Sequence, residues 1–270
     1  MKTILIDEPV HPEILKLFPA EWRLVYMTDK PSAAELAEVD AMFVYAHPIV
    51  DGSFMDQMPQ LKVVANFGVG TPHIDKADAT TRGIPVTNTP GVLHHATADL
   101  TVGLIIAVAR QVVAGHMFAT GPGYTHYDPH KFWGLELRGS TLGIIGMGEI
   151  GVEIARRMHH GFGMKVVYNN RGSVDLKIQG ELHAERVNRE ALLAVSDIVV
   201  LMTPLTEETR GMIGAHELTL MKSTAYLVNT SRGGVLDHDS LVEALKSKKL
   251  AGAALDVTEP EPLPRNHPLL

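Results

Sequence analysis

Short apolar runs alternate with amphipathic helical segments along the whole chain, and this alternation limits the possible folds more than any other feature. Continuous runs of Val, Ile and Leu are typical of strands in a parallel sheet, because crossover helices bury both faces of such a sheet. The first series of runs is TILI (3–6), RLVY (23–26), MFVY (42–45), KVVA (62–65) and PVTN (85–88). A second series consists of TLGIIG, KVVYN, DIVVLM, AYLVN and AGAALD. The pattern therefore predicts an α/β protein.

A longer helical pattern, from about Ala96 to His116, separates the two series of runs. It carries few charges, so we expect one helix that is buried on more than one side. Two series on either side of one helix predict two parallel-sheet domains, Rossmann-like or flavodoxin-like, with a cleft between them. The first domain would consist of residues 1–96 and the second of residues 97–270.

Composition restricts the possible partners. The chain has 270 residues, of which 45% are hydrophobic, but no apolar run is long enough to cross a bilayer. It has no cysteine, which excludes disulfide frameworks and thiolate metal sites and favours a cytoplasmic location. A net charge of −7 argues against an extended nucleic-acid surface. We therefore expect neither a membrane nor a nucleic acid as partner.

The motif GMGEIG follows the run TLGII directly and opens a helical segment. In this setting each glycine has a physical task. Gly146 makes a tight turn, Gly148 lets a pyrophosphate approach the backbone, and Gly151 lets helix and strand pack closely. With Glu149 and Ile150 these glycines form the amino end of the helix, where free N–H groups and a partial positive charge attract phosphate. The motif predicts a dinucleotide site, whereas a ligand-free glycine turn is the alternative.

The next run, KVVYNNRG, bears on the choice of cofactor. NAD sites carry an acidic residue at the end of this strand, which accepts hydrogen bonds from the ribose. That place holds Asn169 here, followed by Asn170 and Arg171. A guanidinium can bind a 2′-phosphate that a carboxylate would repel. We therefore expect NADP as the preferred cofactor and NAD as the second choice, unless Arg171 is only a solvated surface residue.

Several long motifs in order resemble the D-isomer-specific 2-hydroxyacid dehydrogenases, in particular the glyoxylate/hydroxypyruvate and 2-ketogluconate reductase branch. The motifs are FGVGTPHID, GIPVTNTPGVLHHATADLTVGLIIAVAR, GSTLGIIGMGEIG, VLMTPLTEETRGMI, VNTSRGGVLDHDSLVEAL and AGAALDVTEPEPL. The resemblance implies an NAD(P)-dependent oxidoreductase that transfers a hydride between NAD(P)H and a small 2-keto acid, with glyoxylate or hydroxypyruvate as substrate. It also implies a homodimer formed through the 96–116 helix.

The resemblance assigns roles to residues of these motifs. Arg232, in NTSRGG, would hold the carboxylate and carbonyl oxygen of the substrate, a planar pair that suits a guanidinium. The alternative for Arg232 is a structural salt bridge. The backbone amides of Val69 and Gly70 would hold the other side of the carboxylate. The remaining expected cofactor contacts are Thr203, Pro204, Thr230, Ser231 and Asp256.

The carboxyl-terminal stretch LDVTEPEPLPRNHPLL contains two candidate carboxylates and a histidine. The family pattern selects Glu261 over Glu259 as the carboxylate that supports a catalytic histidine, raising the pKa of the imidazole and fixing its orientation. His267 is not that histidine, because the family places it beyond an HPLL-like segment. We therefore expect the 270 residues to stop before the acid–base histidine.

A metal site and two other functions are less consistent with the sequence. His126 and His130 are four residues apart, but the Asp-Pro pair between them breaks a helix, so we expect no metal site. The strongest rival function is a dinucleotide-sensing, corepressor-like interaction protein of the same fold. A second rival is an S-adenosyl-binding protein, for which Arg232 would have no purpose.

Overall fold

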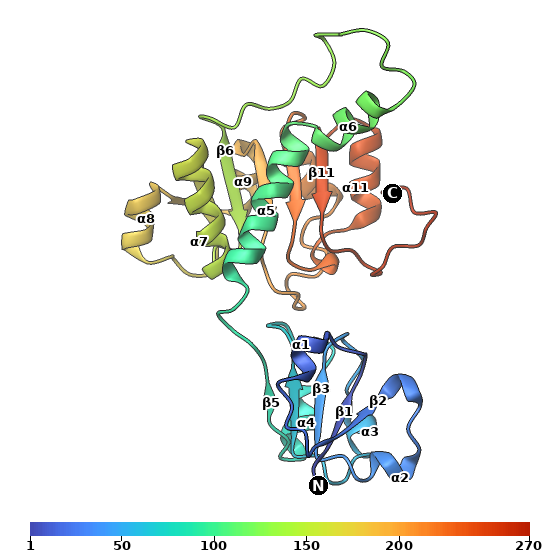
Figure 1. The fold of residues 1–270 in the computed structure, drawn as a ribbon. Coiled ribbons are helices and arrows are strands. Elements are labelled where there is room, and N and C mark those ends of the chain that lie inside the picture. Colours follow the sequence, from blue (N-terminus) through green and yellow to red (C-terminus); the bar gives the residue numbers. More distant parts are fainter. The chain divides into compact units, whose positions relative to one another are not determined.

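The computed structural model describes residues 1–270, which divide into two compact units, Met1–Leu93 and His94–Leu270. Each unit is built on its own parallel β-sheet with helices beside it (Figure 1). The predicted architecture of two parallel-sheet α/β domains is confirmed. The division lies close to the boundary expected after residue 96.

The first unit contains a five-stranded sheet of order β2-β1-β3-β4-β5, which is the flavodoxin-like order. Its strands are β1 (Thr3–Ile6), β2 (Arg23–Tyr26), β3 (Ala41–Val44), β4 (Val63–Asn66) and β5 (Val86–Thr87). Its helices are α1 (Pro12–Leu15), the 3-10 turn η1 (Met27–Asp29), α2 (Ala33–Leu36), α3 (Gly52–Met55) and α4 (Lys76–Thr81). Each apolar run of the first series therefore forms a strand, although some strand ends differ by a residue or two.

Local signals explain where the helices of this unit begin. Ser32 and Glu35 form a capping box at the start of α2, and Asp75 accepts a hydrogen bond from the backbone N–H of Asp78 at the start of α4. Such caps satisfy backbone donors that have no partner inside the helix. The strands are held by burial, since the side chains of Leu5 and Met42 are fully buried.

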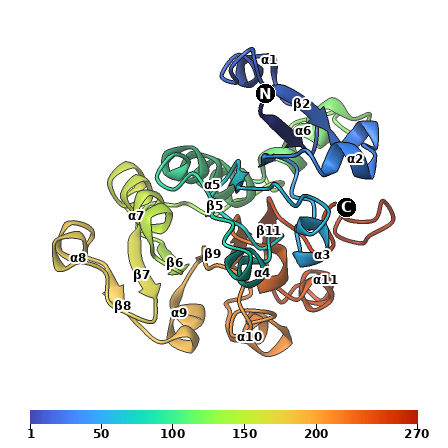
Figure 2. The same cartoon turned by 90° about the horizontal axis from the view of Figure 1, so that it is seen from below.

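The second unit contains a six-stranded sheet of order β11-β10-β9-β6-β7-β8, which is the Rossmann order. Figure 2 labels β11, β9, β6, β7 and β8 of this sheet. Its strands are β6 (Thr141–Ile145), β7 (Lys165–Asn169), β8 (Glu185–Arg186), β9 (Ile198–Leu201), β10 (Tyr226–Asn229) and β11 (Gly252–Leu255). The apolar runs anticipate all of them except β8. This strand has two residues, both charged and exposed, and therefore has no apolar signature.

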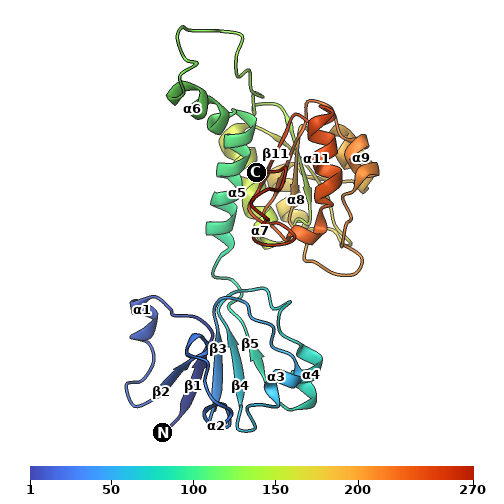
Figure 3. The ribbon, with the colours of Figure 1, turned by 90° about the vertical axis from the view of Figure 1, so that its right-hand side faces the viewer.

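Helices cover both faces of this sheet, as Figure 3 shows. One face carries α5 (His94–Ala109), α7 (Glu149–Arg156), the π turn η2 (Arg157–Gly161) and α8 (Leu176–Leu182). The other carries α9 (Arg189–Val195), α10 (Ala215–Leu220) and α11 (His238–Lys246). A last short element, the 3-10 turn η3 (Gly233–Val235), follows β10. Burial on both sides explains why strands such as β9 are apolar at every position.

The strand order reverses at β6. From β6 the chain goes first to β7 and β8 on one side, and then to β9, β10 and β11 on the other. All the paired strands are parallel, so their carboxyl ends lie at one edge. In sheets of this kind ligands bind at that edge, beside the reversal point.

The single helix expected from about Ala96 to His116 was a wrong prediction. The structure has two helices, α5 and α6 (Val112–Thr120), bent by 58° at a break between them. Gln111 adopts a left-handed conformation (φ 52°), and the backbone N–H of Leu135 donates to the carbonyl of Ala109. The returning segment thus occupies the end of α5. Fewer side chains are buried than expected. The buried residues of α5 lie along one side of the helix, where we expected burial on more than one side, and no residue of α6 is buried.

No single helix is long and apolar enough to cross a bilayer. The bent pair α5 and α6 meets the length and hydropathy criteria only when its two helices are taken together. The buried residues of α5 pack in the core of the second unit, as expected of a core helix in a folded domain.

Candidate functional site

The three glycines of GMGEIG differ in the room that each has for a Cβ atom. Gly146 has a φ of 98°, and a Cβ there would lie 2.6 Å from the backbone of Met202. A Cβ on Gly151 would lie 2.9 Å from the carbonyl oxygen of Gly146. At Gly148 nothing lies within 4 Å of an added Cβ. The first and third glycines thus serve the fold, whereas the second faces open space, as the approach of a pyrophosphate requires.

Helix α7 begins at this open position. Gly148 is its N-cap and has no side chain to satisfy the backbone N–H groups of the first turn. Ile150 and Gly151 belong to that turn, and the backbone N–H groups of the turn are available to a ligand. The carboxylate of Glu149 is bound by His94, whose Nε2 lies 2.9 Å from it. The turn and the helix start therefore fit the phosphates of a dinucleotide.

The two asparagines after β7 point in different directions. The amide of Asn169 donates to the carbonyl of Val187 (2.8 Å). Asn170 accepts from the backbone N–H of Met147 (2.6 Å) and donates to the carbonyl of the same residue (3.0 Å). The side chain that faces the glycine motif is therefore Asn170, and the assignment of the acidic position to Asn169 was one residue too early. Asn170 ties the β7–α8 loop to the turn.

Arg171 is exposed, and its guanidinium makes no hydrogen bond within the chain. Its carbonyl is bound, but only as an acceptor from Arg186. Hydrogen bonds from Thr206 and from its own backbone lower the pKa of Glu208, and the nearby charge of Arg171 lowers that pKa further. The guanidinium thus remains available to an anion at the carboxyl end of β7.

The loop after β9 contains Thr203 and Pro204, which follow Met202 at the carboxyl end of that strand. The Thr203 hydroxyl points to the sulfur of Met212, and the Pro204 carbonyl accepts a hydrogen bond from Thr209 (2.7 Å). Met202 packs against Gly146, so this loop adjoins the glycine turn.

Asn229 organises the loop after β10. Its side-chain oxygen accepts from the backbone N–H and the hydroxyl of Ser231 (3.0 and 2.9 Å), and its amide donates to the carbonyl of Arg232 (3.0 Å). The hydroxyl of Thr230 contacts Thr101 (2.8 Å) and the sulfur of Met202. The hydroxyls of Thr230 and Ser231 are thus both hydrogen bonded inside the protein. Contacts of these two residues with a cofactor would have to come from other atoms.

Arg232 differs from the residues beside it because it is exposed in an otherwise buried loop. Its guanidinium forms no salt bridge, and its hydrogen bond is donated by Nη1 to the neighbouring carbonyl of Ser231 (2.6 Å). A structural salt bridge is the alternative interpretation of this residue, and Arg232 forms none within the chain. The positive charge is free to meet a carboxylate.

The carboxyl-terminal segment lies against the glycines that follow Arg232. A Cβ on Gly233 would lie 2.1 Å from the backbone of Thr258, and one on Gly234 would lie 2.0 Å from the carboxylate of Glu259. At Gly233 only glycine allows the backbone of the segment to pass so close, whereas at Gly234 the nearest atoms belong to side chains, which can move.

The tail carboxylates have different surroundings. Glu259 is bound by Arg210 (2.8 Å), whereas Glu261 is exposed and has no salt bridge or hydrogen bond. The backbone N–H of Asp256 extends the pairing of β11 with β10 by donating to the Asn229 carbonyl (3.0 Å), and its side chain is exposed.

Two histidines lie near this segment. His238 is buried at the start of α11, its Nε2 has no hydrogen-bond partner, and burial lowers the pKa of its imidazole, with a smaller contribution from His267. Burial thus disfavours the charged form of this ring. The Nδ1 of His267 accepts from the backbone N–H of Leu269 (3.3 Å) and so supports a turn of the tail.

In the first unit, asparagine side chains shape the turn after β4. Asn66 donates to the carbonyls of Gly68 and Gly70 (3.1 Å each), and Asn88 donates to the carbonyl of Val69 (2.8 Å). His73 contacts the other end of the Asn66 amide (2.9 Å). With these carbonyls bound, the backbone N–H groups of Val69 and Gly70 make no hydrogen bond in the chain. Two adjacent free donors of this kind suit an anion.

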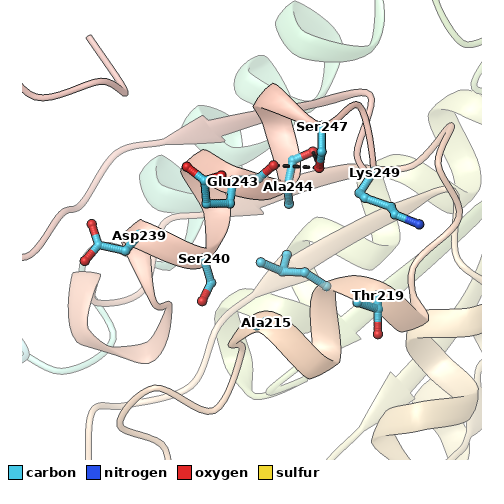
Figure 4. A pocket seen from close by; sticks show the side chains of 9 residues that line it. Ala215, Thr219, Asp239, Ser240, Glu243, Ala244, Ser247 and Lys249 are labelled. Carbon is cyan, nitrogen blue, oxygen red and sulfur yellow. Dashed lines mark hydrogen bonds between the residues drawn. The ribbon is translucent and has the colours of Figure 1, made fainter.

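Two surface hollows lie away from these residues. One, of about 410 Å³, lies between α10 and α11, with an apolar floor and a rim that includes Asp239, Glu243 and Lys249 (Figure 4). Another, of about 550 Å³, lies at the amino ends of β6 and β7, beside Thr141 and Lys165. Neither contains a predicted site residue, and the second lies at the edge opposite the glycine motif.

Sequence reasoning missed several residues that organise the site: Asn66, Asn88, Asn229 and Arg186. A signal existed for two of them, because Asn66 and Asn229 are the last residues of β4 and β10, where an amide can bond to the loop that follows. Nothing in the sequence indicates Arg186, which belongs to the strand without an apolar signature.

Comparison with known proteins agrees with this geometry. Residues 102–270 match the model of the D-isomer specific 2-hydroxyacid dehydrogenase family, NAD binding domain. The glyoxylate reductase of Aeropyrum pernix is 44% identical, over 98% of this chain and 82% of its own length. The structure of the TT0316 protein from Thermus thermophilus is similar with a TM-score of 0.89 and 38% identity, over 98% of this chain and 85% of that one. An NADPH-dependent glyoxylate/hydroxypyruvate reductase from Sinorhizobium meliloti, solved with NADP and malonate, gives a TM-score of 0.87 at 30% identity, over 99% and 84%.

The open space at Gly148 gives a prediction. Gly148 has a φ of −87°, which any residue adopts, so Gly148→Ala should leave the unfolding midpoint unchanged. The added methyl group should weaken NADPH and NADH binding by about tenfold, because it occupies the path of the pyrophosphate. Titration of protein fluorescence with each cofactor measures this. Gly180→Ala is the control, since Gly180 in α8 also has open space but lies outside the motif. Equal affinities for Gly148→Ala and wild type would contradict the placement of the pyrophosphate.

Proposed function

Because this chain belongs to the D-isomer specific 2-hydroxyacid dehydrogenases, which are NAD(P)-dependent oxidoreductases acting on 2-keto acids and 2-hydroxy acids, we propose that it reduces glyoxylate and hydroxypyruvate. Relatives from Aeropyrum pernix, Thermofilum pendens and Thermococcus litoralis that are 44%, 45% and 46% identical are glyoxylate reductases, which supports the choice of glyoxylate. The rival function, a dinucleotide-sensing interaction protein, finds no support among them.

The observation that carries the proposal is the unpaired guanidinium of Arg232 at the carboxyl end of β10. A 2-keto acid presents its carboxylate and carbonyl oxygens in one plane, so a planar guanidinium can donate to both. As hydride adds to the carbonyl carbon, negative charge grows on the carbonyl oxygen, and the same guanidinium stabilises it. When bound, the dinucleotide supplies that hydride.

Further residues support this chemistry. The free N–H groups of Val69 and Gly70 would bind the substrate carboxylate, so we assign residues 1–96 to the substrate and residues 97–270 to the dinucleotide. We assign Glu261 as the carboxylate that orients the acid–base histidine, because Glu259 is already bound by Arg210. Asp256, at the end of β11, would contact the nicotinamide carboxamide.

Arg232→Ala should lower kcat/KM for glyoxylate and hydroxypyruvate by about 100-fold or more, raising KM and lowering kcat together, because the guanidinium acts on both substrate and transition state. Steady-state kinetics of the full-length protein with a panel of 2-keto acids tests this and the substrate preference. Arg189→Ala is the control, because it removes an arginine that pairs with Glu217 instead. An unchanged kcat/KM would remove Arg232 from the site, and no reduction of any 2-keto acid by the wild type would refute the proposal.

NADP is the proposed preferred cofactor, since Arg171 is exposed and unpaired and amides replace the acidic residue at the end of β7. Arg171→Ala should weaken NADPH by about 1.5–3 kcal/mol, the value of a hydrogen bond to a charged group, and leave NADH nearly unchanged. Dissociation constants for both cofactors measure the effect. Equal losses for the two cofactors would refute this role of Arg171.

We also propose a homodimer. Apolar side chains of α6 and the loop that follows it are exposed in the single chain, among them Met117 (69%), Tyr127 (79%) and Trp133 (73%). Apolar groups gathered in this way commonly mark an interface. Val113→Glu combined with Met117→Glu should give a monomer in light scattering at micromolar concentration. A wild-type monomer under the same conditions would contradict the proposal.

The proposed location is the cytoplasm, in agreement with a chain that has no cysteine. The proposed partners are the small 2-keto acid, the dinucleotide and a second copy of the chain. The net charge of −7 favours neither nucleic acid nor an anionic membrane surface as a further partner.

A further inference from the structure

Arg186 holds the backbone of the loop that carries Arg171. It lies in the two-residue strand β8, and its Nη2 donates to the carbonyls of Asn170 (3.0 Å) and Arg171 (2.8 Å). Its Nη1 lies 3.5 Å from the hydroxyl of Ser173. The guanidinium therefore contacts the loop on both sides of Gly172.

The contacts of Arg186 differ from those of the salt-bridged arginines of this unit. Arg156, Arg157 and Arg189 pair with carboxylates, which partly neutralise them. Arg186 forms no salt bridge, and its partners are carbonyl and hydroxyl oxygens without net charge. Its positive charge therefore remains on the loop, next to that of Arg171.

The same loop is fixed from the opposite side. Asn170 exchanges two hydrogen bonds with the backbone of Met147, inside the glycine motif. A continuous series of contacts thus runs from Arg186 through Asn170 to the turn that would receive the pyrophosphate. The backbone that presents Arg171 is set relative to that turn, and this is the geometry a ligand with phosphates at both places requires.

We propose that Arg186 is a positioning residue for the 2′-phosphate of NADP, fixing the loop that presents Arg171 and adding a second positive charge to it. The inference rests on the proposed preference for NADP and adds a residue to it. The competing explanation is that Arg186 only stabilises β8, which pairs with β7 through Glu185 and Arg186. A structural role of that kind would affect every dinucleotide equally.

Two ligands separate these explanations, because 2′-phospho-ADP-ribose and ADP-ribose differ only in the 2′-phosphate. Isothermal titration of the full-length protein with each ligand measures both affinities without turnover. Arg186→Met keeps an apolar stem and removes the donors and the charge, whereas Arg186→Lys keeps the charge and some donors. Arg189→Met removes the same charge from α9 and serves as the control, and thermal unfolding of each variant reports on stability.

Arg186→Met should weaken 2′-phospho-ADP-ribose by about tenfold and change ADP-ribose by less than about twofold, with Arg186→Lys between methionine and wild type. Equal weakening of both ligands, no change in either, or a lysine variant no better than methionine would overturn the inference. If Arg171→Ala discriminates between the ligands and Arg186→Met does not, only the role of Arg186 fails. If neither variant discriminates, the proposed NADP preference fails with it.

Discussion

The parallel pairing of β6 with β7 on one side and β9 on the other is the constraint on which the site in the second unit depends. Parallel pairing brings the carboxyl ends of all these strands to one edge. Because the strand order reverses at β6, the loops that follow β7 and β9 lie on opposite sides of the loop that follows β6. The glycine turn after β6 is thereby bordered by Asn170 from one neighbour and Met202 from the other. Residues far apart in the sequence, such as Met147 and Asn170, are brought within hydrogen-bond distance there.

Asparagines at strand ends then decide which backbone atoms face a ligand. Asn66, Asn170 and Asn229 follow or end β4, β7 and β10, and each uses its amide to bond the loop beside it. A short amide with both donors and an acceptor can hold a loop in a conformation that backbone pairing alone would not select. In the turn after β4 the carbonyls are bound in this way, which leaves the N–H groups of Val69 and Gly70 without partners.

The sequence predicted the features that arise from apolar periodicity and glycine geometry, and it failed where hydrogen bonds between distant residues decide. The strands could be read because they are buried on both faces, and Gly146 because its turn needs a positive φ. The break at Gln111 could not be read, because it depends on the return of Leu135 to the end of α5. The choice between Asn169 and Asn170 depends on which side chain faces Met147, and an adjacent pair with the same chemistry conceals it.

The distribution of charge links these local results to anion binding. Arginines on the helices of the second unit, such as Arg156 and Arg157, form salt bridges with carboxylates. At the carboxyl edge of the sheet, Arg171 and Arg232 form no salt bridge, although Glu208 lies near enough to Arg171 for its pKa to be lowered by that charge. The one acidic residue at the start of α7, Glu149, is bound by His94. The guanidinium groups of Arg171 and Arg232 are thus available to an anion, whereas the carboxylate of Glu149 is paired with His94. Phosphates and a substrate carboxylate would bind at this edge. We infer that these two guanidinium groups, which form no salt bridge in the chain, contribute mainly when an anion binds.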